Sequence, residues 1–581
     1  MTSEGPDRPD VVLILTDQER AAPPYESDEL RAWRASTLAA WRWFDEHGVS
    51  FTRHYTGSLA CVPSRPTLLT GQYPDVHGVT QTDGLGKDAD DTAMRWLPPG
   101  SVPTLGNWFR AAGYDTYYEG KWHVSHADLH DPATGAVLDT NDDDGRVDPV
   151  AVQAYLDADP LGPFGFSGWV GPEPHGGRWS NCGYRRDPIY AGRILTWLDD
   201  RYRRRAASDA AACRPFLLVA SFVNPHDIVL FPGWMRRSPL ADDPFDTPSV
   251  LPPPTADEDL ATKPAAQAAY RAAYPTGYAP IADGVYDEHA DEYRRLYHRL
   301  LAEVDGPIDA VRRAVVDGST SAVLVRTADH GELLGAHGGL HQKWFNLYDE
   351  AARVPFVIAR TGTSETSGRL VDLPTSHVDL VPTLLAAAGI DPPDHAADFA
   401  SRFTELHPFP GTDLLPIVDG ARPPTDRAVY LMTRDNILEG DSGASAVARS
   451  FGHSTDVPPE MRIHVPEDVA ANFEAIVTTI DGRLWKLVRT HDDPATWTEP
   501  GVRHLATTGP GGRRWRTEPL PDEWELYDLT GDPIEVDNRW HDPAVSTVRS
   551  ELVSRLSAER DRCCPPRHTP WPYRPRLQPT V

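Results

Sequence analysis

The sequence contains little cysteine, and the cysteines it has are scattered. Only five occur among 581 residues, and no two of them form a CxxC pair. They are Cys61, Cys182, Cys213, Cys563 and Cys564. A disulfide framework or a zinc site built from thiolates needs more cysteines at closer and more regular spacing. We therefore predict neither of these features.

Long hydrophobic runs are also missing. No segment approaches the roughly 18 consecutive apolar residues that a membrane helix requires. The first ten residues, MTSEGPDRPD, are polar and acidic, without the basic and apolar regions of a secretory signal. These absences predict a cytoplasmic protein that does not associate with membranes. The length is sufficient for a large core and for two or more domains.

Positive charge is scarce. The 56 lysines and arginines are outnumbered by 85 acidic residues, so the formal net charge is -29. A surface of this sign repels nucleic acid and anionic membranes, and we expect neither as a partner. An anionic substrate would therefore need a locally positive pocket, built from a metal ion and a few lysine, arginine and histidine side chains.

Short apolar, β-branched runs alternate with helical segments. The runs typical of buried parallel strands are Val11–Thr16, Tyr114–Tyr118, Phe216–Val223, Ala322–Arg326 and Val354–Ala359. Residues 102–113 and 376–389 have helix-start signals and end at glycine, which is typical of helices. This alternation predicts an α/β fold with a mixed, mostly parallel central sheet between layers of helices.

The sequence pattern changes after about residue 425. Residues 475–480 and 483–488 flank Asp481-Gly482, a pair that favours the type I′ turn of a β-hairpin. We predict a catalytic domain over residues 1–424 and a smaller C-terminal α+β subdomain over residues 425–581, with this antiparallel hairpin and a tail. Residues 242–288, rich in proline, alanine and aspartate, are expected to form a surface insertion.

Reactive residues follow four of the predicted strands. The four strand exits carry Asp17-Gln18, Lys121 with His123, His226, and Asp329-His330. In open α/β sheets, ligands bind at the carboxyl ends of the strands. We therefore expect these side chains to converge on one rim of the sheet.

Residues 61–71, CVPSRPTLLTG, place a cysteine at the expected N-terminal end of a helix, which Pro66 would help to start. Helix N-termini favour negative charge, so they can lower the pKa of a thiol and bind an anion. Arg65 adds a fixed positive charge. From the residues alone, Cys61 is either a reactive thiol in an anion site or a buried structural cysteine.

The CVPSR motif, followed by PTLLTG, resembles the signature of the type I sulfatases, formylglycine-dependent enzymes of the alkaline phosphatase superfamily. The resemblance extends over most of the chain through LTDQ, GKWH, NPH, ADHGE, GAHGGLHQKW and the late ELYDLTGDP. It implies an alkaline phosphatase-like fold and a sulfuric ester hydrolase. It also implies that a formylglycine-generating enzyme oxidises Cys61 to formylglycine during maturation. The family usually has arginine where this chain has Gln72, a change that we expect to be tolerated.

The resemblance further implies one divalent metal ion. Its ligands would be Asp17, Gln18, Asp329, His330 and an oxygen of the modified Cys61. Hard oxygen ligands suit calcium or magnesium. Many relatives have aspartate in place of Gln18 and asparagine in place of His330, so this set is less charged and softer, and manganese becomes an alternative to calcium, with magnesium less favoured. Glu332 is expected to orient neighbouring groups.

The remaining catalytic roles also follow from the resemblance. Arg65 and the metal ion would lower the pKa of one hydroxyl of the hydrated aldehyde, which then attacks the ester. Lys121 and Lys343 would meet the charge on the transferred group. His226 and Lys343 would lie at the leaving group, and His123 would take the proton of the second hydroxyl, so that the product is expelled.

The motifs look closer to choline-sulfatase-like and phosphonate monoester hydrolase-like members than to secreted glycan sulfatases. We expect a small anionic ester as substrate, foremost an aryl or small alkyl sulfate. A phosphonate monoester or phosphodiester hydrolase with the same nucleophile is an alternative, and a non-catalytic metal-binding interaction protein with this fold is another. The aromatic stretch 164–184 is a candidate wall of the substrate pocket, with ordinary loop packing as the alternative. The oligomeric state is left open, a homo-oligomer included.

Overall fold

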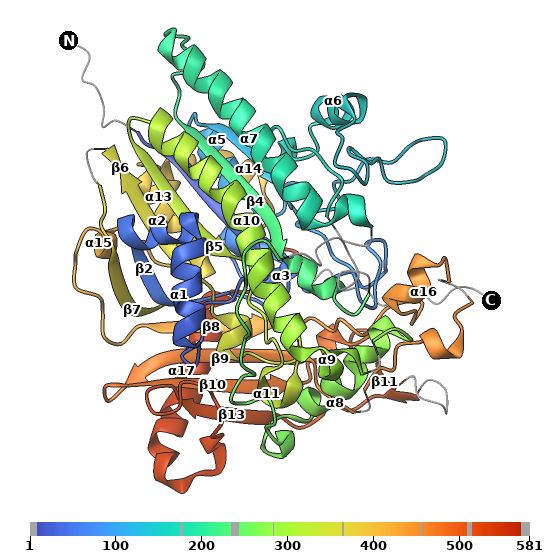
Figure 1. The fold of residues 1–581 in the computed structure, drawn as a ribbon. Coiled ribbons are helices and arrows are strands. Elements are labelled where there is room, and N and C mark those ends of the chain that lie inside the picture. Colours follow the sequence, from blue (N-terminus) through green and yellow to red (C-terminus); the bar gives the residue numbers. More distant parts are fainter. Residues whose placement is uncertain are drawn as a thin grey trace.

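A seven-stranded sheet lies at the centre of the computed structural model. The structure describes residues 8–174, 178–233, 243–282, 284–362, 365–453, 456–466, 468–507 and 514–570. Within these ranges the strand order is β3-β4-β1-β5-β6-β2-β7 (Figure 1). The strands are β1 (Asp10–Asp17), β2 (Gly48–Tyr55), β3 (Asp115–Gly120), β4 (Phe216–Pro225), β5 (Ala322–Ala328), β6 (Phe356–Thr361) and β7 (Arg369–Ser376). Strand β6 runs antiparallel to β5 and β2, and the other neighbouring pairs are parallel, which confirms the predicted mixed, mostly parallel sheet.

Strand β1 shows why its sequence is continuously apolar. All eight of its residues are buried. Successive side chains of a strand point to opposite faces of the sheet. Val12 and Ile14 accordingly pack into one hydrophobic cluster, whereas Val11, Leu13 and Leu15 pack into another on the opposite face. A central parallel strand that is covered on both faces therefore favours apolar side chains along most of its length.

Helices cover both faces of the central sheet. One face is covered by α2 (Ala39–His47), α7 (Gly183–Ala206) and α10 (Ala290–Gly318), and the other by α3 (Cys61–Thr70), α5 (Leu105–Ala111), α13 (Leu380–Ala387) and α14 (Pro392–Arg402). Figure 1 shows the long helices α7 and α10 side by side across the sheet. Helices α5 and α13 lie within the two segments predicted to be helical. Among the described residues, no helix combines the length and apolar composition needed to cross a bilayer.

The other helices are short, apart from α17, and lie around these layers. They are α1 (Asp28–Thr37), α4 (Pro74–His77), α6 (Pro149–Ala158), α8 (Ala265–Ala273), α9 (Val285–Glu288), α11 (Ala336–Gly339), α12 (Asp349–Ala352), α15 (Leu415–Val418), α16 (Ala446–Ser450) and α17 (Ser546–Cys563).

A second, antiparallel sheet is formed by the C-terminal part of the chain, in the order β13-β10-β9-β8. Its strands are β8 (Ala428–Thr433), β9 (Asn472–Ile480), β10 (Arg483–His491) and β13 (Glu523–Asp528), and β11 (His504–Thr507) pairs separately with β12 (Arg514–Arg516). The predicted hairpin is confirmed, because Asp481 and Gly482 join β9 to β10 with φ angles of 49° and 75°. Helix α17 packs on this sheet. Strand β8 begins near the predicted boundary at residue 425, and the division into two domains stays a prediction.

The segment 242–288, predicted to be a surface insertion, is mostly exposed or half-buried in its described part but also contributes buried aromatic residues, and its being an insertion stays a prediction. Residue 242 lies outside the described residues, together with 234–241 and 283. In the described part, α8 contributes the fully buried Tyr270, and Tyr274 follows it with 2% exposure. Both rings belong to the same hydrophobic cluster as Trp344 and Tyr348. The alanine-rich composition conceals this burial, because a few large aromatic residues carry the packing.

A buried lysine connects the second sheet to helix α12. The ammonium group of Lys486 on β10 lies 2.6 Å from Asp349 and 2.7 Å from Glu535, and all three side chains are buried or nearly so. We expect Lys486→Met to lower the free energy of unfolding by about 3–5 kcal/mol, because it removes the cation beside the buried Glu535 and leaves Asp349 paired with Arg353 alone. Chemical denaturation measures this change. The exposed Arg422→Met variant is the control and should stay within about 0.5 kcal/mol of the unchanged protein; equal stability of the two variants would contradict this role of Lys486.

Candidate active site

The predicted site residues lie together at one edge of the central sheet. Asp17 ends β1, Lys121 follows β3, His226 follows β4, and Asp329 follows β5. These strands are parallel neighbours in the order β3-β4-β1-β5, so their carboxyl ends meet at the same edge. The structure thus brings the four strand exits together, whereas the catalytic roles of these residues stay predictions.

A glycine determines how Lys121 enters this edge. Gly120 has a φ of 103°, and a Cβ atom there would lie 1.8 Å from the carbonyl oxygen of Ser221 on β4. Only glycine fits so close an approach in this conformation. The amide of Lys121 then donates to the same carbonyl at 2.9 Å. The backbone conformation and the close approach of β4 therefore require glycine before the lysine of the GKWH motif.

Helix α3 brings Cys61 to the edge at its first position, as predicted, and every residue of the helix is buried. The hydroxyl of Ser64 donates to the backbone carbonyl of Asp329 at 2.5 Å, which ties the first turn of the helix to the end of β5. The expectation that Pro66 starts the helix is wrong, because Pro66 lies inside it. Pro63 occupies the first turn instead, where the missing amide hydrogen costs nothing.

Arg65 links all four strand ends. Its guanidinium donates to Asp17 at 3.0 Å, to Asp329 at 2.9 Å, to the carbonyl of Lys121 at 2.7 Å and to the hydroxyl of Ser221 at 2.9 Å. The side chain is 1% exposed. A buried charge in this position is tolerated because each of its bonds goes to an acceptor, two of them carboxylates. Arg65 therefore organises the site as well as supplying positive charge.

The thiol of Cys61 is not activated in the way that its position suggested. Burial, with a contribution from the negative charge of Asp17, raises the pKa of Cys61 to about 11. Lys121 lies 3.8 Å from the sulfur and lowers the pKa, but not enough to offset burial. Desolvation therefore favours the neutral thiol, whereas the residues alone had left a reactive thiol and a buried cysteine as alternatives. At neutral pH the unmodified side chain is a neutral thiol, which is a poor nucleophile.

Asp17 and Asp329 have different electrostatic surroundings. Burial alone would raise the pKa of Asp17, but the positive charges of Lys121, at 2.7 Å, and of Arg65 hold it well below its usual value. Burial and the neighbouring charge of Asp17 raise the pKa of Asp329 to about 7. Two carboxyl groups so close together favour a cation between them, since both can then be ionised.

Four side chains offer ligand atoms around one point. One atom each from Asp17, Cys61, Asp329 and His330 lies within 4.8 Å of the others, and all four residues are buried. Asp17 Oδ1 and His330 Nε2 have no hydrogen-bond partner, and they lie 3.6 Å apart. Burial and the charge of Lys343 hold the pKa of His330 well below its usual value, so the imidazole is neutral, as a metal ligand must be. Buried ligand atoms that lack hydrogen-bond partners and lie close together fit a divalent cation.

Gln18 lies beside this cluster but is engaged by its neighbours. Its amide oxygen accepts from the ammonium group of Lys343 at 2.8 Å, and its amide nitrogen donates to the carboxylate of Glu332. Glu332 also accepts from the amide of Gln342 at 2.7 Å. The carboxylate thus fixes which way the Gln18 amide faces, as expected for an orienting residue. Coordination of the metal ion by Gln18 stays a prediction.

The histidine after β4 is held by two aspartates. Asp187 on α7 accepts from the backbone amides of Val223 and Asn224 at 2.7 and 2.9 Å, while Asp227 accepts from two backbone amides at the start of α7. This reciprocal pair of bonds fixes the turn that carries His226. Burial, with the charge of Lys121, holds the pKa of His226 well below its usual value. The NPHD motif signalled Asp227, but nothing in the sequence signalled Asp187.

His123 lies in a turn that a second carboxylate holds. Its φ of 52° is unusual for a residue other than glycine. The buried Glu173 accepts from the backbone amides of His123 at 2.7 Å and of Trp122 at 3.3 Å, which stabilises this turn. The imidazole Nε2 lies 2.8 Å from Asp83. Neither Glu173 nor Asp83 follows a predicted strand, so the sequence reasoning missed both.

A cavity of about 440 Å³ opens above these groups. Its base is lined by Cys61, Lys121, His123, His226 and Lys343, and its outer walls include Leu85, Val229, Leu230, Tyr278, Trp344 and Ala446. The aromatic stretch 164–184 contributes none of the described lining, and its residues 175–177 lie outside the described part. Trp169 packs into the core instead, so loop packing is the correct interpretation for that ring.

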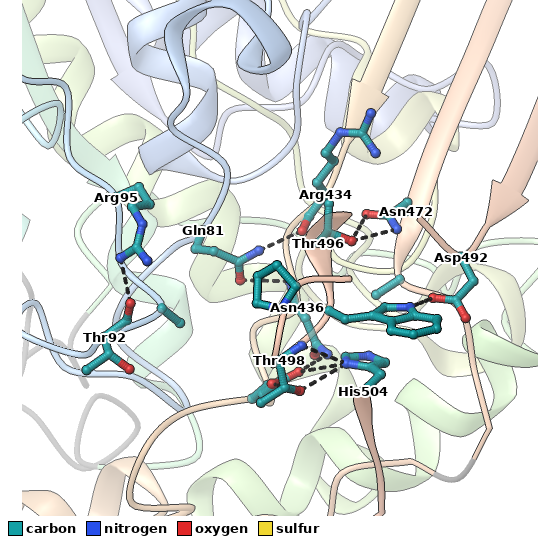
Figure 2. Close-up of a pocket in the computed structure, with 15 residues that line it drawn as sticks. Gln81, Thr92, Arg95, Arg434, Asn436, Asn472, Asp492, Thr496, Thr498 and His504 are labelled. Atoms are coloured by element: carbon teal, nitrogen blue, oxygen red, sulfur yellow. Dashed lines mark hydrogen bonds and ion pairs between the residues drawn. The ribbon is translucent and has the colours of Figure 1, made fainter. Parts of the chain in front are cut away.

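A smaller cavity lies elsewhere, where the loop before α5 meets the second sheet. Figure 2 shows its polar lining, in which Gln81 donates to the carbonyl of Arg434 at 2.7 Å and Trp497 donates to Asp492 at 2.7 Å. Its volume is about 50 Å³, and none of the predicted site residues lines it. We interpret it as a gap in the polar contact between the loop before α5 and the second sheet.

A second group of possible metal ligands consists of Glu405, His407 and His568. Both carboxylate oxygens of Glu405 already accept hydrogen bonds, from the amides of His568 and Thr569 at 2.9 Å each, and His407 Nε2 lies 2.9 Å from one of them. The buried carboxylate therefore anchors the chain around residue 568. This group contains carboxylate and imidazole side chains, as the cluster at Asp17 does. Its carboxylate oxygens, however, already have hydrogen-bond partners.

The fold and the site together define an α/β protein with a buried cluster of charged and metal-ligating side chains at the carboxyl edge of its sheet. The sulfatase family model matches residues 9–390, about two thirds of the chain. The chain belongs to the sulfatase family and is a sulfuric ester hydrolase.

Individual relatives agree with this assignment. The sequence is 28% identical over 398 residues to the uncharacterised sulfatase YidJ of Escherichia coli, covering 67% of this chain and 69% of that protein. It is 26% identical over 437 residues to the choline-sulfatase of Rhizobium meliloti, covering 71% and 72%. The fold is similar to the phosphonate monoester hydrolase from Silicibacter pomeroyi, with a TM-score of 0.55 at 20% identity over 96% of each chain.

Proposed function

We propose that this enzyme hydrolyses small aryl or alkyl sulfate esters, using a formylglycine made from Cys61 and one divalent metal ion. The observation that supports the proposal is the position of Cys61. It shares one buried cluster with Asp17, Asp329 and His330, and it also lines the 440 Å³ cavity. A nucleophile formed there would reach both a bound cation and an ester in the cavity. A formylglycine-generating enzyme is the maturation partner that this chemistry requires.

The two groups that complete the site would supply distinct chemistry. Formylglycine, hydrated, would supply two hydroxyls on one carbon, one as nucleophile and one as the source of a proton. A divalent ion, when bound by Asp17, Asp329, His330 and the modified residue 61, would act as a Lewis acid toward oxygen. Calcium or manganese suits this mixture of carboxylate and imidazole ligands better than magnesium.

The side chains around the cavity would do the remaining work. Lys121 and Lys343 carry positive charge at the base of the cavity, where charge develops on the sulfuryl oxygens. His226 and Lys343 would hold the leaving oxygen and supply its proton. His123 would accept the proton that must leave residue 61 before sulfate can depart. Arg65 is bonded to both carboxylates and would hold them in place throughout.

The cavity walls favour an apolar leaving group. Leu85, Val229, Leu230 and Trp344 line the outer part. Arg449, which also lines it, is engaged by Asp88 at 2.8 Å and by the backbone carbonyls of residues 84, 85 and 444. Polar side chains such as Lys87, Asp88 and Ser450 also line the cavity, but most of its exposed lining is apolar, so an aryl or alkyl group would bury its surface there.

Comparing two ester classes tests the proposal. Sulfate monoesters and phosphonate monoesters carry the same single negative charge, so the positive base of the cavity does not by itself separate them. With enzyme in which the conversion of residue 61 has been measured, we expect kcat/KM for p-nitrophenyl sulfate to exceed that for p-nitrophenyl phenylphosphonate by at least about tenfold. The reverse order would make the protein a phosphonate monoester hydrolase. Failure to hydrolyse either ester with full conversion would support a non-catalytic role.

A further inference from the structure

A carboxylate lies beside the imidazole that the proposed reaction uses as its base. Asp83 Oδ1 is 2.8 Å from His123 Nε2, and the two side chains are 5% and 4% exposed. The residues come from different parts of the fold, since Asp83 lies in the loop after α4 and His123 in the turn after β3. We propose that Asp83 is a positioning residue that holds His123 in the orientation and tautomer required for proton transfer. This inference rests on the proposed function.

The contact determines which imidazole nitrogen can act as the base. An ionised carboxylate accepts hydrogen bonds and cannot donate them, so Nε2 must carry the hydrogen that lies between Asp83 and His123. Nδ1 is then the nitrogen with the available lone pair. When Nδ1 takes a proton from a hydroxyl of residue 61, Nε2 keeps its own hydrogen, and the positive charge of the imidazolium is balanced by Asp83. Without the carboxylate, the other tautomer would compete.

Neighbouring residues hold both His123 and the loop of Asp83 in place. Glu173 fixes the backbone of His123 through two amide bonds, and the ring of Trp96 lies 5.7 Å from the imidazole, centroid to centroid. On the other side, the amide of Thr82, next to Asp83, donates to Asp435 Oδ1 at 3.1 Å. The C-terminal part of the chain thus supports the loop that carries Asp83. Such support is what a positioning role requires, because a misplaced base loses most of its effect.

Asp83 also lines the cavity, so a direct contact with substrate is the competing explanation. The two explanations differ in their kinetics. A residue that acts through His123 slows a step after release of the alcohol, which lowers kcat and KM together and leaves kcat/KM unchanged. A residue that contacts the substrate changes kcat/KM.

The test uses the nearly isosteric Asp83→Asn variant of the full chain, with p-nitrophenyl sulfate as substrate. We expect kcat to fall by about 10²- to 10³-fold, because the carboxylate no longer selects the tautomer, and KM to fall with it, so that kcat/KM stays within about threefold. Rapid mixing should show a burst of p-nitrophenol that matches the enzyme concentration, followed by slow turnover, because the step that uses His123 comes after release of the alcohol. The fraction of residue 61 converted, measured by mass spectrometry, should be unchanged.

The matched control is Asp90→Asn. Asp90 also pairs with a histidine, His126, at 3.5 Å, but its side chain is 84% exposed and it does not line the cavity. This variant should keep the kcat and KM of the unchanged enzyme.

A double variant separates the possible outcomes. If Asp83 acts through His123, adding Asp83→Asn to His123→Ala should cost no further activity. Additive losses, or a raised KM with kcat preserved in Asp83→Asn, would overturn the inference while leaving the proposed function intact. Full activity of His123→Ala, by contrast, would remove His123 from the proposed reaction itself.

Discussion

Replacing Cys61 by alanine is expected to abolish turnover of sulfate esters, with a loss of at least about 10⁴-fold in kcat. The loss is expected because the proposed reaction requires a nucleophile at this position, and the other proposed catalytic groups act on that nucleophile or on the ester that it attacks. Alanine removes the nucleophile but leaves the binding groups, so substrate affinity should change little. Initial rates with p-nitrophenyl sulfate measure the effect, and equilibrium binding of inorganic sulfate checks that the cavity is intact.

The matched control is Cys213→Ala, since Cys213 is a free, exposed cysteine far from the cluster in the sequence and absent from the cavity lining. It should keep full activity. Retention of more than a trace of activity in the Cys61 variant would mean that the nucleophile lies elsewhere, and the proposed reaction would have to be abandoned.

Replacing Asp329 by asparagine should remove both the metal ion and activity. Asp329 and Asp17 are the two carboxylates of the cluster, and loss of either leaves the cation with insufficient negative charge. We expect kcat/KM to fall by at least about 10³-fold, more than the roughly 10- to 100-fold cost of disturbing groups that only orient a ligand. Metal analysis of purified protein should fall from one ion per chain to none. Added calcium or manganese should restore activity to chelator-treated unchanged enzyme, but not to the variant at the same concentration.

Glu405→Gln is the informative control for this measurement. Glu405 belongs to the other group of possible ligands, with His407 and His568, and its oxygens are already occupied by hydrogen bonds. The variant should keep its metal ion and its activity. If instead Glu405→Gln lost the ion and Asp329→Asn kept it, the metal centre would have been assigned to the wrong cluster.

Three of the four strands that carry the site, β1, β4 and β5, were predictable because each is a mostly apolar run that ends in polar residues, whereas β3 (DTYYEG) gives a weaker signal. Strands β2 and β7 were missed for the opposite reason. In β7, RLVDLPTS, charged residues and a proline interrupt the apolar pattern, and Arg369 and Leu370 are partly or largely exposed. Such strands are identified by their pairing with a neighbour rather than by their own composition.

The site residues likewise divide into those that the sequence could locate and those that it could not. Those that directly follow strands, such as Asp17 and Asp329, could be located because parallel topology fixes where strand ends meet. Asp83 and Glu173 lie in loops, and only the folded structure shows that they hold His123. The raised pKa of Cys61 could not be predicted, because the sequence indicates a helix N-terminus but not the complete burial of the thiol.

The most direct test is a mass spectrum of the peptide that contains residue 61, taken from enzyme whose activity per chain has been measured. The account predicts that the sulfur of Cys61 is replaced by an aldehyde oxygen, that the peptide reacts with a hydrazide, and that activity rises in proportion to the converted fraction. Fully active enzyme with an intact thiol at position 61 would contradict it.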